Sequence, residues 1–280
     1  MILIAESGAT KTDWRLIQND GRTRAAKTEG MNAAVMDAER IAASAARAKK
    51  LLGAGNVSSI FIYAAGLVDG GRESEIFDGI FGELYPGATC GYASDLLACA
   101  RAVCGHGPGI AAILGTGSNS CFYDGERIVK NVRTCGFILG DFGSAAVLGK
   151  RFVTDYLQNL IPAELAREFA ATFEVDYATV VKNVYKGGSP AAYLGSFAPW
   201  IEAHYEGYEY VQKLMEDNFR DFIVRCIKQY DYRKYEVGVT GGFGVAYREL
   251  LRKVGREEGV SFGRFCAAPM DGLIDYHKNL

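Results

Sequence analysis

Hydrophobic and polar positions follow the same order twice along the chain, once at its start and once near its middle. Residues 2–4 and 110–114 are short apolar runs with the length and bulk of buried strands. Each run leads into a loop rich in glycine and hydroxyl residues, and a second strand and an Asp-Gly turn follow each loop. This repeat predicts two similar lobes that each present a loop, with a ligand held between them.

Alternating helices and strands are predicted for the rest of the first half. Apolar periodicity, bounded by glycine and proline, predicts helices over 37–52, 72–84 and 94–104 and strands over 59–64 and 89–92. Such alternation is typical of α/β layers around a mixed sheet. Because the glycine-rich stretch 105–109 is the best linker, we expect an N-terminal lobe over 1–108 and a C-terminal lobe over 109–280.

The second half is expected to carry more helix. Helices are predicted over 143–160, in two pieces over 162–188, over most of 191–230 with a break near 206–207, and over 243–255. A buried strand is predicted over 235–239, and a last helix over 269–277 can pack back on the N-terminal lobe. The C-terminal lobe is therefore expected to contain a helical insertion.

The loop after the second apolar run has the features of an anion site. Residues 115–119, Gly-Thr-Gly-Ser-Asn, offer several backbone N–H groups, two hydroxyls and an amide with little side-chain bulk. Glycine lets the backbone approach a ligand closely, and successive N–H groups form a concave nest for an anion such as phosphate. The same residues also fit a plain tight hairpin, with 121–123 as the returning strand. The two interpretations are compatible.

Charge and composition argue against several classes of partner. A net charge of −2 and a pI near 6.0 give no electrostatic basis for binding nucleic acid or an anionic membrane. No apolar run reaches the roughly 20 residues of a membrane-spanning helix, and we expect no signal peptide because the start lacks a basic region. The seven cysteines form no C-x-x-C pair, and the three histidines are too scattered for a zinc site. We expect a cytoplasmic protein with reduced thiols.

Four motifs, in order, resemble those of the N-acetylglucosamine kinase family. Residues 7–14 and 114–120 resemble its two phosphate loops, 136–144 its connecting motif and 240–244 its adenosine motif. The family belongs to the superfamily of sugar kinases, heat-shock chaperones and actin, in a group with ATPase subunits of benzoyl-CoA reductase and activators of hydroxyacyl-CoA dehydratases. The resemblance extends along almost the whole chain. It implies an α/β fold of two ribonuclease-H-like lobes, as in actin-like ATPases, around a central nucleotide cleft.

The resemblance also implies ATP and Mg²⁺ as cofactors and gives individual residues a role. The positions that match nucleotide-binding residues of the family are Gly8, Thr10, Lys11, Gly115, Thr116, Gly117, Ser118, Gly241 and Gly242. Asp95 matches the general base that acts on the sugar 6-hydroxyl. Asn32, Asp95, Gly136 and Asp141 match positions on the sugar side. Glu6 and Asp141 match positions near the metal ion.

Local structure alone offers a simpler account of several of these residues. Ser94 or Asp95 would serve as a helix N-cap, and so would Asp141. The glycines at 241–242 fit an ordinary strand-to-helix turn, although backbone without side chains at a helix N-terminus also suits a nucleotide. Asn32 fits a turn.

Three positions depart from the family pattern. Glu6 stands where many superfamily members carry aspartate, although glutamate also occurs there in this family and can hold water around Mg²⁺. Phe142 stands where a glutamate commonly follows Asp141, which removes a carboxylate near the metal or the acceptor. The adenosine motif reads Gly241-Gly242-Phe243 in place of Gly-Ser or Gly-Gly-Val.

These features together predict an ATP-dependent sugar kinase that phosphorylates the 6-hydroxyl of N-acetylglucosamine or a related amino sugar. The competing enzyme is an ATPase of the dehydratase-activator or benzoyl-CoA reductase type; those activators bridge an iron–sulfur cluster through cysteines in a setting that this sequence does not show. A third alternative is a nucleotide- or sugar-binding protein that lost catalysis with the change at Phe142. The expected partners are a sugar and ATP, with no nucleic acid and no membrane, and a homodimer is left open.

Overall fold

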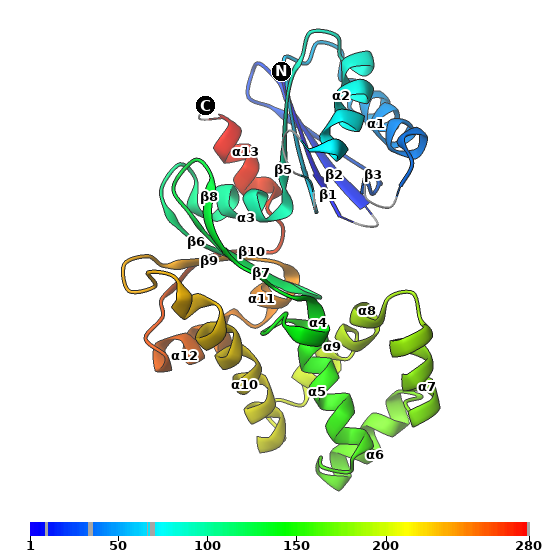
Figure 1. Cartoon of the computed structure of the whole chain (residues 1–280), viewed down its shortest axis with the longest axis vertical. Coiled ribbons are helices and arrows are strands. Elements are labelled where there is room, and N and C mark those ends of the chain that lie inside the picture. Colours follow the sequence, from blue (N-terminus) through cyan, green and yellow to red (C-terminus); the bar gives the residue numbers. More distant parts are fainter. Residues whose placement is uncertain (9–10, 33–35, 66, 68–70, 279–280) are drawn as a thin grey trace. The chain divides into compact units, whose positions relative to one another are not determined.

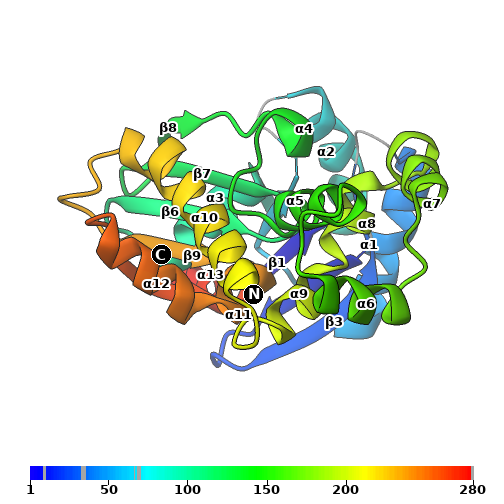
Figure 2. The same ribbon diagram turned by 90° about the horizontal axis from the view of Figure 1, so that it is seen from below.

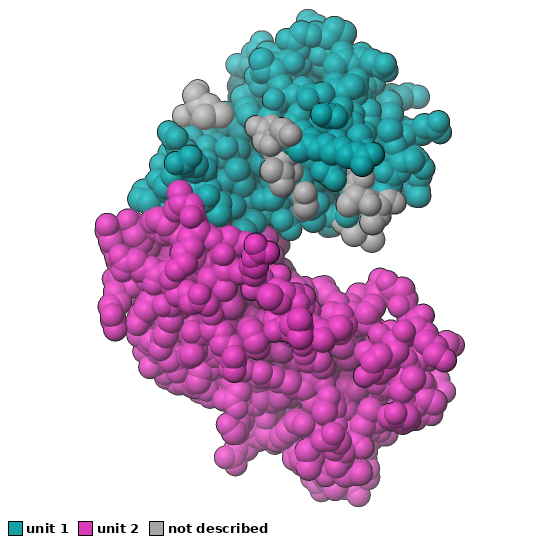
Figure 3. All heavy atoms as spheres, in the orientation of Figure 1, with its two compact units in different colours: residues 1–108, 123–128, 268–280 teal, residues 109–122, 129–267 magenta. Residues whose placement is uncertain are grey.

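The computed structural model describes residues 1–8, 11–32, 36–65, 67 and 71–278. The chain divides into two compact units, coloured separately in Figure 3. Unit 1 comprises residues 1–108, 123–128 and 268–280, and unit 2 comprises residues 109–122 and 129–267. Both the tip of one hairpin and the C-terminal segment thus belong to unit 1.

Unit 1 contains a five-stranded mixed sheet in the order β3-β2-β1-β4-β5. Its strands are β1 (Ile2–Ser7), β2 (Lys11–Ile17), β3 (Thr23–Glu29), β4 (Ser59–Ala64) and β5 (Thr89–Ser94). β2 runs antiparallel to both β1 and β3, whereas β4 is parallel to β1 and β5 is parallel to β4. The register places Ser7, Ala64 and Ser94 side by side, so the carboxyl ends of three parallel strands meet at one edge.

Helices cover both faces of this sheet (Figure 1). They are α1 (Ala38–Leu52), α2 (Arg72–Leu84), α3 (Asp95–Cys104) and α13 (Met270–Lys278). Successive residues of a strand point to opposite faces. Leu3 accordingly packs in a core with Ile41 and Phe77 of α1 and α2, and Ile4 packs in another with Ala98 and Leu273 of α3 and α13.

Unit 2 repeats the same strand plan. Its sheet has the order β10-β9-β6-β7-β8, formed by β6 (Gly109–Leu114), β7 (Ser118–Tyr123), β8 (Ile128–Val132), β9 (Val237–Thr240) and β10 (Phe262–Cys266). β9 is parallel to β6 and β10 is parallel to β9, as β4 and β5 follow β1 in unit 1. The repeated topology confirms the predicted α/β fold of two ribonuclease-H-like lobes.

Most of the helices belong to unit 2. They are α4 (Gly136–Leu139), α5 (Ala145–Leu157), α6 (Ala163–Thr172), α7 (Tyr177–Val181), the π-helix η1 (Lys182–Lys186), α8 (Pro190–Gly195), α9 (Ala198–Ala203), α10 (Glu209–Arg225), the 3₁₀ turn η2 (Ile227–Gln229), α11 (Gly242–Ala246) and α12 (Arg248–Glu257). Helices α6 to α9 gather beside α5, apart from α12, in both views (Figures 1 and 2). They pack through aromatic side chains, with Phe152, Phe169 and Trp200 at their centre. Among the described residues, no helix is long and apolar enough to cross a membrane.

Several predicted elements are confirmed and others are wrong. The strand over 59–64 and the helix over 72–84 agree residue for residue. The sequence pattern assigned no strand to β3, β8 or β10, although it predicted the turns that precede β3 and β8. The predicted helix over 243–255 is interrupted at Tyr247, and the helix predicted over most of 191–230 is divided into α8, α9, α10 and η2.

Candidate active site

In unit 2, the carboxyl ends of β6 and β9 lie side by side under the start of α11. Gly241 follows β9 with φ 106°, and a Cβ there would lie 2.3 Å from the carbonyl oxygen of Leu114, the last residue of β6. A Cβ on Gly244 would lie 2.7 Å from the side chain of Val239. Only glycine therefore lets α11 pack this closely over the two strand ends. Ligands of open α/β sheets commonly bind at such an edge.

The β6–β7 turn, Gly115–Gly117, is held by the first turn of α5. The Gly115 N–H donates to the Gly117 carbonyl (2.9 Å), and the N–H groups of Ala145 and Ala146 donate to the carbonyls of Gly115 (3.0 Å) and Thr116 (3.1 Å). The α5 N-terminus thus fixes the shape of the predicted phosphate loop, because two of its otherwise unpaired N–H groups are used to hold it.

A cavity of about 390 Å³ lies beside this turn. Its lining residues are Gly115, Thr116, Ala145, Gly195, Ala198, Pro199, Gly242, Phe243, Ala246 and Tyr247. The structure therefore brings Gly115 and Thr116 of one predicted motif together with Gly242 of another. A Cβ on Gly242 would meet nothing within 4 Å, so this glycine faces open space, whereas Gly241 is required by the backbone.

Asp141 of the predicted connecting motif lies against the same turn. Its backbone has φ 50°, and its N–H donates to the Thr134 carbonyl (2.9 Å). Its carboxylate accepts hydrogen bonds from the backbone N–H of Ser118 and the side chain of Thr134. Burial raises the pKa of this carboxyl, against the opposing effect of those two hydrogen bonds and of Lys150. Asp141 is thus fixed beside Gly117 and Ser118.

Close packing explains the glycines that flank Asp141. A Cβ on Gly140 would lie 1.7 Å from the Thr134 carbonyl oxygen, and a Cβ on Gly143, which has φ 78°, would lie 2.5 Å from the Cβ of Phe222. Ser144 then caps α5, its Oγ accepting from the N–H of Val147 at 3.2 Å. The N-cap of this helix is therefore Ser144, which excludes the simpler account of Asp141 as the cap.

Phe142 and Gly136 occupy different surroundings. The ring of Phe142 packs against the core of unit 2 and lies beneath the Arg225 guanidinium, 4.8 Å from the ring centroid. Gly136 begins α4 with φ 68° and is exposed, with nothing within 4 Å of an added Cβ. Lys150 ties α4 to α5 by donating to the Phe137 carbonyl (2.6 Å). Gly136 is not among the residues that line the cavity beside the β6–β7 turn.

In unit 1, three carboxylates gather at the end of the sheet. Glu6 of β1 lies directly opposite Asp13 of β2 in the antiparallel register. The pKa of Glu6 is raised by burial and then by the charges of Asp13 and Asp95, and Lys11 partly offsets this. Asp13 is 9% exposed, and the ion pairs that it makes with described residues are long, to Lys11 (3.8 Å) and Lys27 (3.9 Å). Like charges that face each other across neighbouring strands are destabilising. Their presence here, with a raised pKa at Glu6, is typical of a functional site.

Sequence reasoning did not single out Asp13. The usable signal was the alternation along β2, which places residues 11 and 13 on one face next to Glu6.

Asp95 follows directly on β5 as the first residue of α3. The cap of this helix is Ser94, whose Oγ accepts from the N–H of Leu97 at 3.2 Å. Asp95 Oδ1 accepts from the N–H of Leu96 at 2.9 Å, and burial raises the pKa of its carboxyl despite that hydrogen bond. Asp95 is thus not needed as the cap and lies at the sheet edge where β1, which carries Glu6, also ends.

The β1–β2 turn is tied to the segment that carries Asn32. Ser7 Oγ is 2.9 Å from Thr12 Oγ1 and accepts from the N–H of Met31 at 2.7 Å. Asn32 follows Met31 directly, and its carbonyl accepts from the N–H of Met36. Gly8 closes the turn with its N–H on the Lys11 carbonyl (2.9 Å). Thr10, predicted to bind phosphate, lies outside the described residues.

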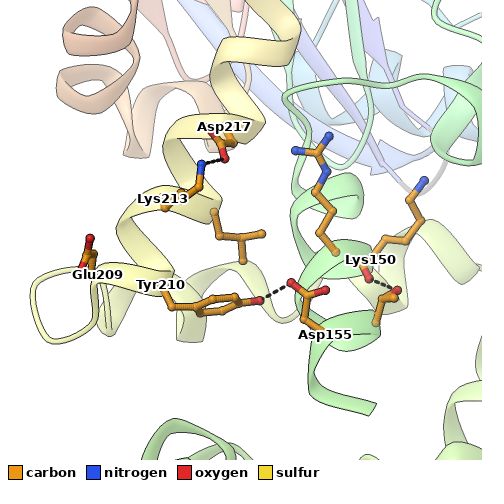
Figure 4. A pocket seen from close by; sticks show the side chains of 9 residues that line it. Lys150, Asp155, Glu209, Tyr210, Lys213 and Asp217 are labelled. Carbon is orange, nitrogen blue, oxygen red and sulfur yellow. Dashed lines mark hydrogen bonds and ion pairs between the residues drawn. The ribbon is translucent and has the colours of Figure 1, made fainter. Parts of the chain in front are cut away.

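A larger cavity, of about 660 Å³, lies between α5 and α10 (Figure 4). It contains none of the predicted site residues. Four of its polar side chains bond in pairs: the Tyr210 hydroxyl donates to Asp155 (2.7 Å) and Lys213 to Asp217 (2.7 Å). Because these groups are already paired, the smaller cavity beside the β6–β7 turn is the better candidate for a ligand site.

The carboxylates suit magnesium chemistry without forming a metal cage. Among the described residues, no group of three or more His, Cys, Asp or Glu side chains could hold a metal ion. Mg²⁺ at phosphoryl-transfer sites keeps several waters and is held by one or two carboxylates and by the phosphates of the substrate. Each unit has one carboxylate near a predicted phosphate loop, Glu6 in unit 1 and Asp141 in unit 2, and each is a ligand of the type that Mg²⁺ prefers.

Comparisons with known proteins identify relatives by structure. No family model and no curated protein matches the chain. A solved structure from Porphyromonas gingivalis, provisionally assigned as an N-acetylglucosamine kinase, is 34% identical over 100% of this chain and 99% of its own, with a TM-score of 0.90. A second, from Chromobacterium violaceum with the same provisional assignment, is 20% identical over 98% of both chains, with a TM-score of 0.75. A ROK family glucokinase from Streptomyces griseus, solved with glucose and AMPPNP, shares the fold at 17% identity over 99% of this chain and 98% of its own, with a TM-score of 0.55.

Proposed function

Because the chain belongs to the N-acetylglucosamine kinase family, we propose that it transfers the γ-phosphoryl group of ATP to the 6-hydroxyl of N-acetylglucosamine or a related amino sugar. One observation carries the proposal. Two separately predicted motifs, the second phosphate loop and the adenosine motif, meet at one cavity through Gly115, Thr116 and Gly242. Its volume of about 390 Å³ lies within the usual range for a small-molecule site.

The nucleotide would lie with its base and ribose in the cavity and its phosphates at the β6–β7 turn. Small residues line the cavity, and the turn offers backbone without bulk. Phosphoryl transfer depends mainly on positioning and on neutralising charge. A turn that is fixed by α5 before the ligand arrives suits that requirement, because no loop has to be ordered during the reaction. In unit 1, Gly8 and Lys11 would supply the first phosphate loop.

Glu6 of unit 1 and Asp141 of unit 2 are the two carboxylates that we propose as magnesium ligands, alongside phosphate oxygens of the nucleotide. The ion would supply neutralisation of the charge on the transferred group. The carboxylates of Glu6 and Asp13 face each other across the strand pair and repel, and a cation bound beside them would reduce that repulsion. The raised pKa values of Glu6 and Asp141 fit carboxylates that are partly buried without a full complement of partners.

Asp95 would accept the proton of the sugar 6-hydroxyl. It stands at the carboxyl end of β5, and Ser94 already caps its helix. A raised pKa makes its carboxylate a stronger base than an ordinary aspartate. Asn32, Gly136 and Asp141 would contact the sugar.

The test is a coupled ADP-release assay with a panel of sugars: N-acetylglucosamine, N-acetylmannosamine, glucosamine, glucose and no sugar. We expect ADP release that depends on an N-acetylated hexose, with a 6-phosphate identified by NMR. ADP release without any sugar would favour the ATPase of the dehydratase-activator type. Binding of sugar and nucleotide without turnover would favour a protein that has lost catalysis.

A pair of variants tests the nucleotide site. Gly242→Val places a side chain in the cavity without a clash, because nothing lies within 4 Å of its Cβ. We expect ADP affinity to fall at least ~10-fold, the equivalent of ~1.4 kcal/mol. Gly188→Val is the matched control, since Gly188 is exposed and also has open space at its Cβ. Equal ADP affinity for both folded variants would place the nucleotide outside this cavity.

A further inference from the structure

The side chains that line the nucleotide cavity offer a base almost nothing to hydrogen-bond. Six of its ten lining residues are glycine or alanine, and three others are Pro199, Phe243 and Tyr247. The tenth, Thr116, lies in the β6–β7 turn, at the proposed phosphate end. All of unit 2 from 109 to 122 and from 129 to 267 is described, and within it the lining includes no charged side chain and no side-chain amide.

Several of the other polar groups in the lining are already bonded. The Tyr247 hydroxyl donates to the Ala198 carbonyl at 3.3 Å. The N–H groups of Ala145 and Ala146 hold the β6–β7 turn. Pro199 has no N–H to offer. The cavity therefore presents contact surface to a base, with few side-chain donors or acceptors to distinguish one purine edge from another; the N–H groups at the start of α11 are the backbone donors that remain.

The shape of the cavity and its access to solvent then determine which bases can bind in it. The buried rings of Phe243 and Tyr247 pack edge to face, with centroids 4.6 Å apart, and make a firm apolar wall. Pro199, Gly242 and Ala246 are exposed at the rim. The flat ring of a base would lie against this wall, and its hydrogen-bonding edge would stay in contact with water at the rim. Exchanging adenine for another purine would then break no hydrogen bond to a protein side chain.

From this lining we infer that the cavity recognises a purine by its shape and not by its hydrogen-bonding edge. The phosphoryl donors are then purine nucleoside triphosphates as a class, and GTP and ITP are accepted about as well as ATP. The inference rests on the proposed kinase function, because it names the donor of that same reaction. A site built to hydrogen-bond its substrate rejects an analogue that lacks the group by ~10⁴- to 10⁵-fold, because the site's own polar groups are left unpaired. At the base end, the lining of this cavity includes no polar side chain that such an analogue would leave unpaired.

Calorimetric titration of the full chain with ADP, IDP, GDP and CDP, in the presence of Mg²⁺, tests the inference directly. We expect the dissociation constants of the three purine diphosphates to agree within tenfold. CDP should bind at least ~10-fold more weakly than ADP, because a pyrimidine buries less apolar surface. A preference for ADP over GDP or IDP of more than tenfold overturns the inference, and so does CDP binding as tight as ADP binding.

Gly242→Val separates failure of the inference from failure of the kinase proposal. If the base lies in the cavity, this variant weakens ADP and GDP by the same factor. If ATP supports sugar phosphorylation while Gly242→Val leaves ADP affinity unchanged, the base lies elsewhere and the inference fails although the kinase proposal stands. If no sugar is phosphorylated but the purine diphosphates bind equally, the kinase proposal fails and recognition by shape stands.

Discussion

The carboxylate of Asp141 lies so close to Gly117 that a Cβ at position 117 would come within 3.0 Å of Asp141 Oδ2. The two residues belong to separate motifs, and the N–H of Ser118 bonds to the same carboxylate. Glycine at position 117 therefore leaves room for the Asp141 carboxylate in its observed position. The contact also places a carboxylate directly beside the proposed phosphate site.

Gly117→Ala should disturb this contact. The added methyl group would push the Asp141 carboxylate aside by a few tenths of an ångström or more, and misplacement near reacting groups is costly. We expect turnover to fall by ~10- to 100-fold, with little change in melting temperature. Gly188→Ala is the control, because Gly188 is exposed and nothing lies within 4 Å of its added Cβ. Equal turnover in the two variants would show that the position of Asp141 does not matter for the reaction.

Elements with strong local signals could be predicted from the sequence. Helix α1 is the clearest example. Asp37 caps it by accepting from the Arg40 N–H, and Gly53 ends it in the left-handed conformation. The charged and glycine residues that mark these ends are readable without any knowledge of the fold.

The strands that were not predicted, β3, β8 and β10, lie at sheet edges, and their own patterns are weak. β3 reads Thr-Arg-Ala-Ala-Lys-Thr-Glu and is mostly exposed, with Thr28 as its buried residue. β10 has Gly263-Arg264 in its middle. Such strands form because a neighbouring strand offers hydrogen bonds, and that neighbour is not visible in a local window.

Distinctions within the site depended on contacts between distant segments. The role of Gly241 follows from the carbonyl of Leu114, and the environment of Asp13 follows from Glu6 across the strand pair. The sequence marked the glycines and the carboxylates but could not show which glycine faces the cavity. It also could not show that Ser94, and not Asp95, caps α3.

Phe142→Glu should not restore a metal carboxylate. The ring packs in the core beneath Arg225, so the substitution removes apolar contacts and puts a charge in their place. We expect a loss of about 1–2 kcal/mol in the free energy of unfolding, part of the value of a fully buried phenylalanine. The Mg²⁺ concentration for half-maximal turnover should not fall.

Phe142→Leu is the control for that experiment, because it keeps most of the apolar contact and adds no charge. We expect it to retain turnover and to lose less stability than Phe142→Glu. Higher turnover or a lower Mg²⁺ requirement in the glutamate variant would mean that the side chain at 142 reaches the metal region after all.

His277 should make unit 1 sensitive to acid. Burial first, and then the charges of Arg101 and His106, lower its pKa to about 3, and its Nε2 lies 2.8 Å from the Tyr63 hydroxyl. Above pH 6.5 the imidazole is neutral in both the folded and the unfolded state. As the pH falls from 6.5 toward 3, only the unfolded state gains the proton, so the free energy of unfolding drops by up to ~1.4 kcal/mol per pH unit.

Urea denaturation between pH 7 and pH 4 measures this effect. His277→Gln can still accept a hydrogen bond but cannot be protonated, so its stability should fall less steeply with acid than that of the parent chain. Because carboxylates contribute to both curves, the difference between the two slopes is the informative quantity. Identical slopes would show that His277 is not the acid-sensitive group.

Asp95→Asn should stop the reaction without unfolding the protein. The amide keeps the size of the side chain and can still accept a hydrogen bond, but it cannot take the proton of the sugar hydroxyl. We expect turnover to fall by at least ~100-fold, while ADP binding is retained. In the parent enzyme, turnover should rise with pH through a pKa above the ordinary range of an aspartate, because burial raises that pKa and the base must be ionised.

Ser94→Ala, which removes the cap of α3, should instead cost about 1 kcal/mol of stability and leave turnover nearly intact. Near-normal turnover in folded Asp95→Asn would remove Asp95 from the mechanism and leave Asp141 as the next candidate.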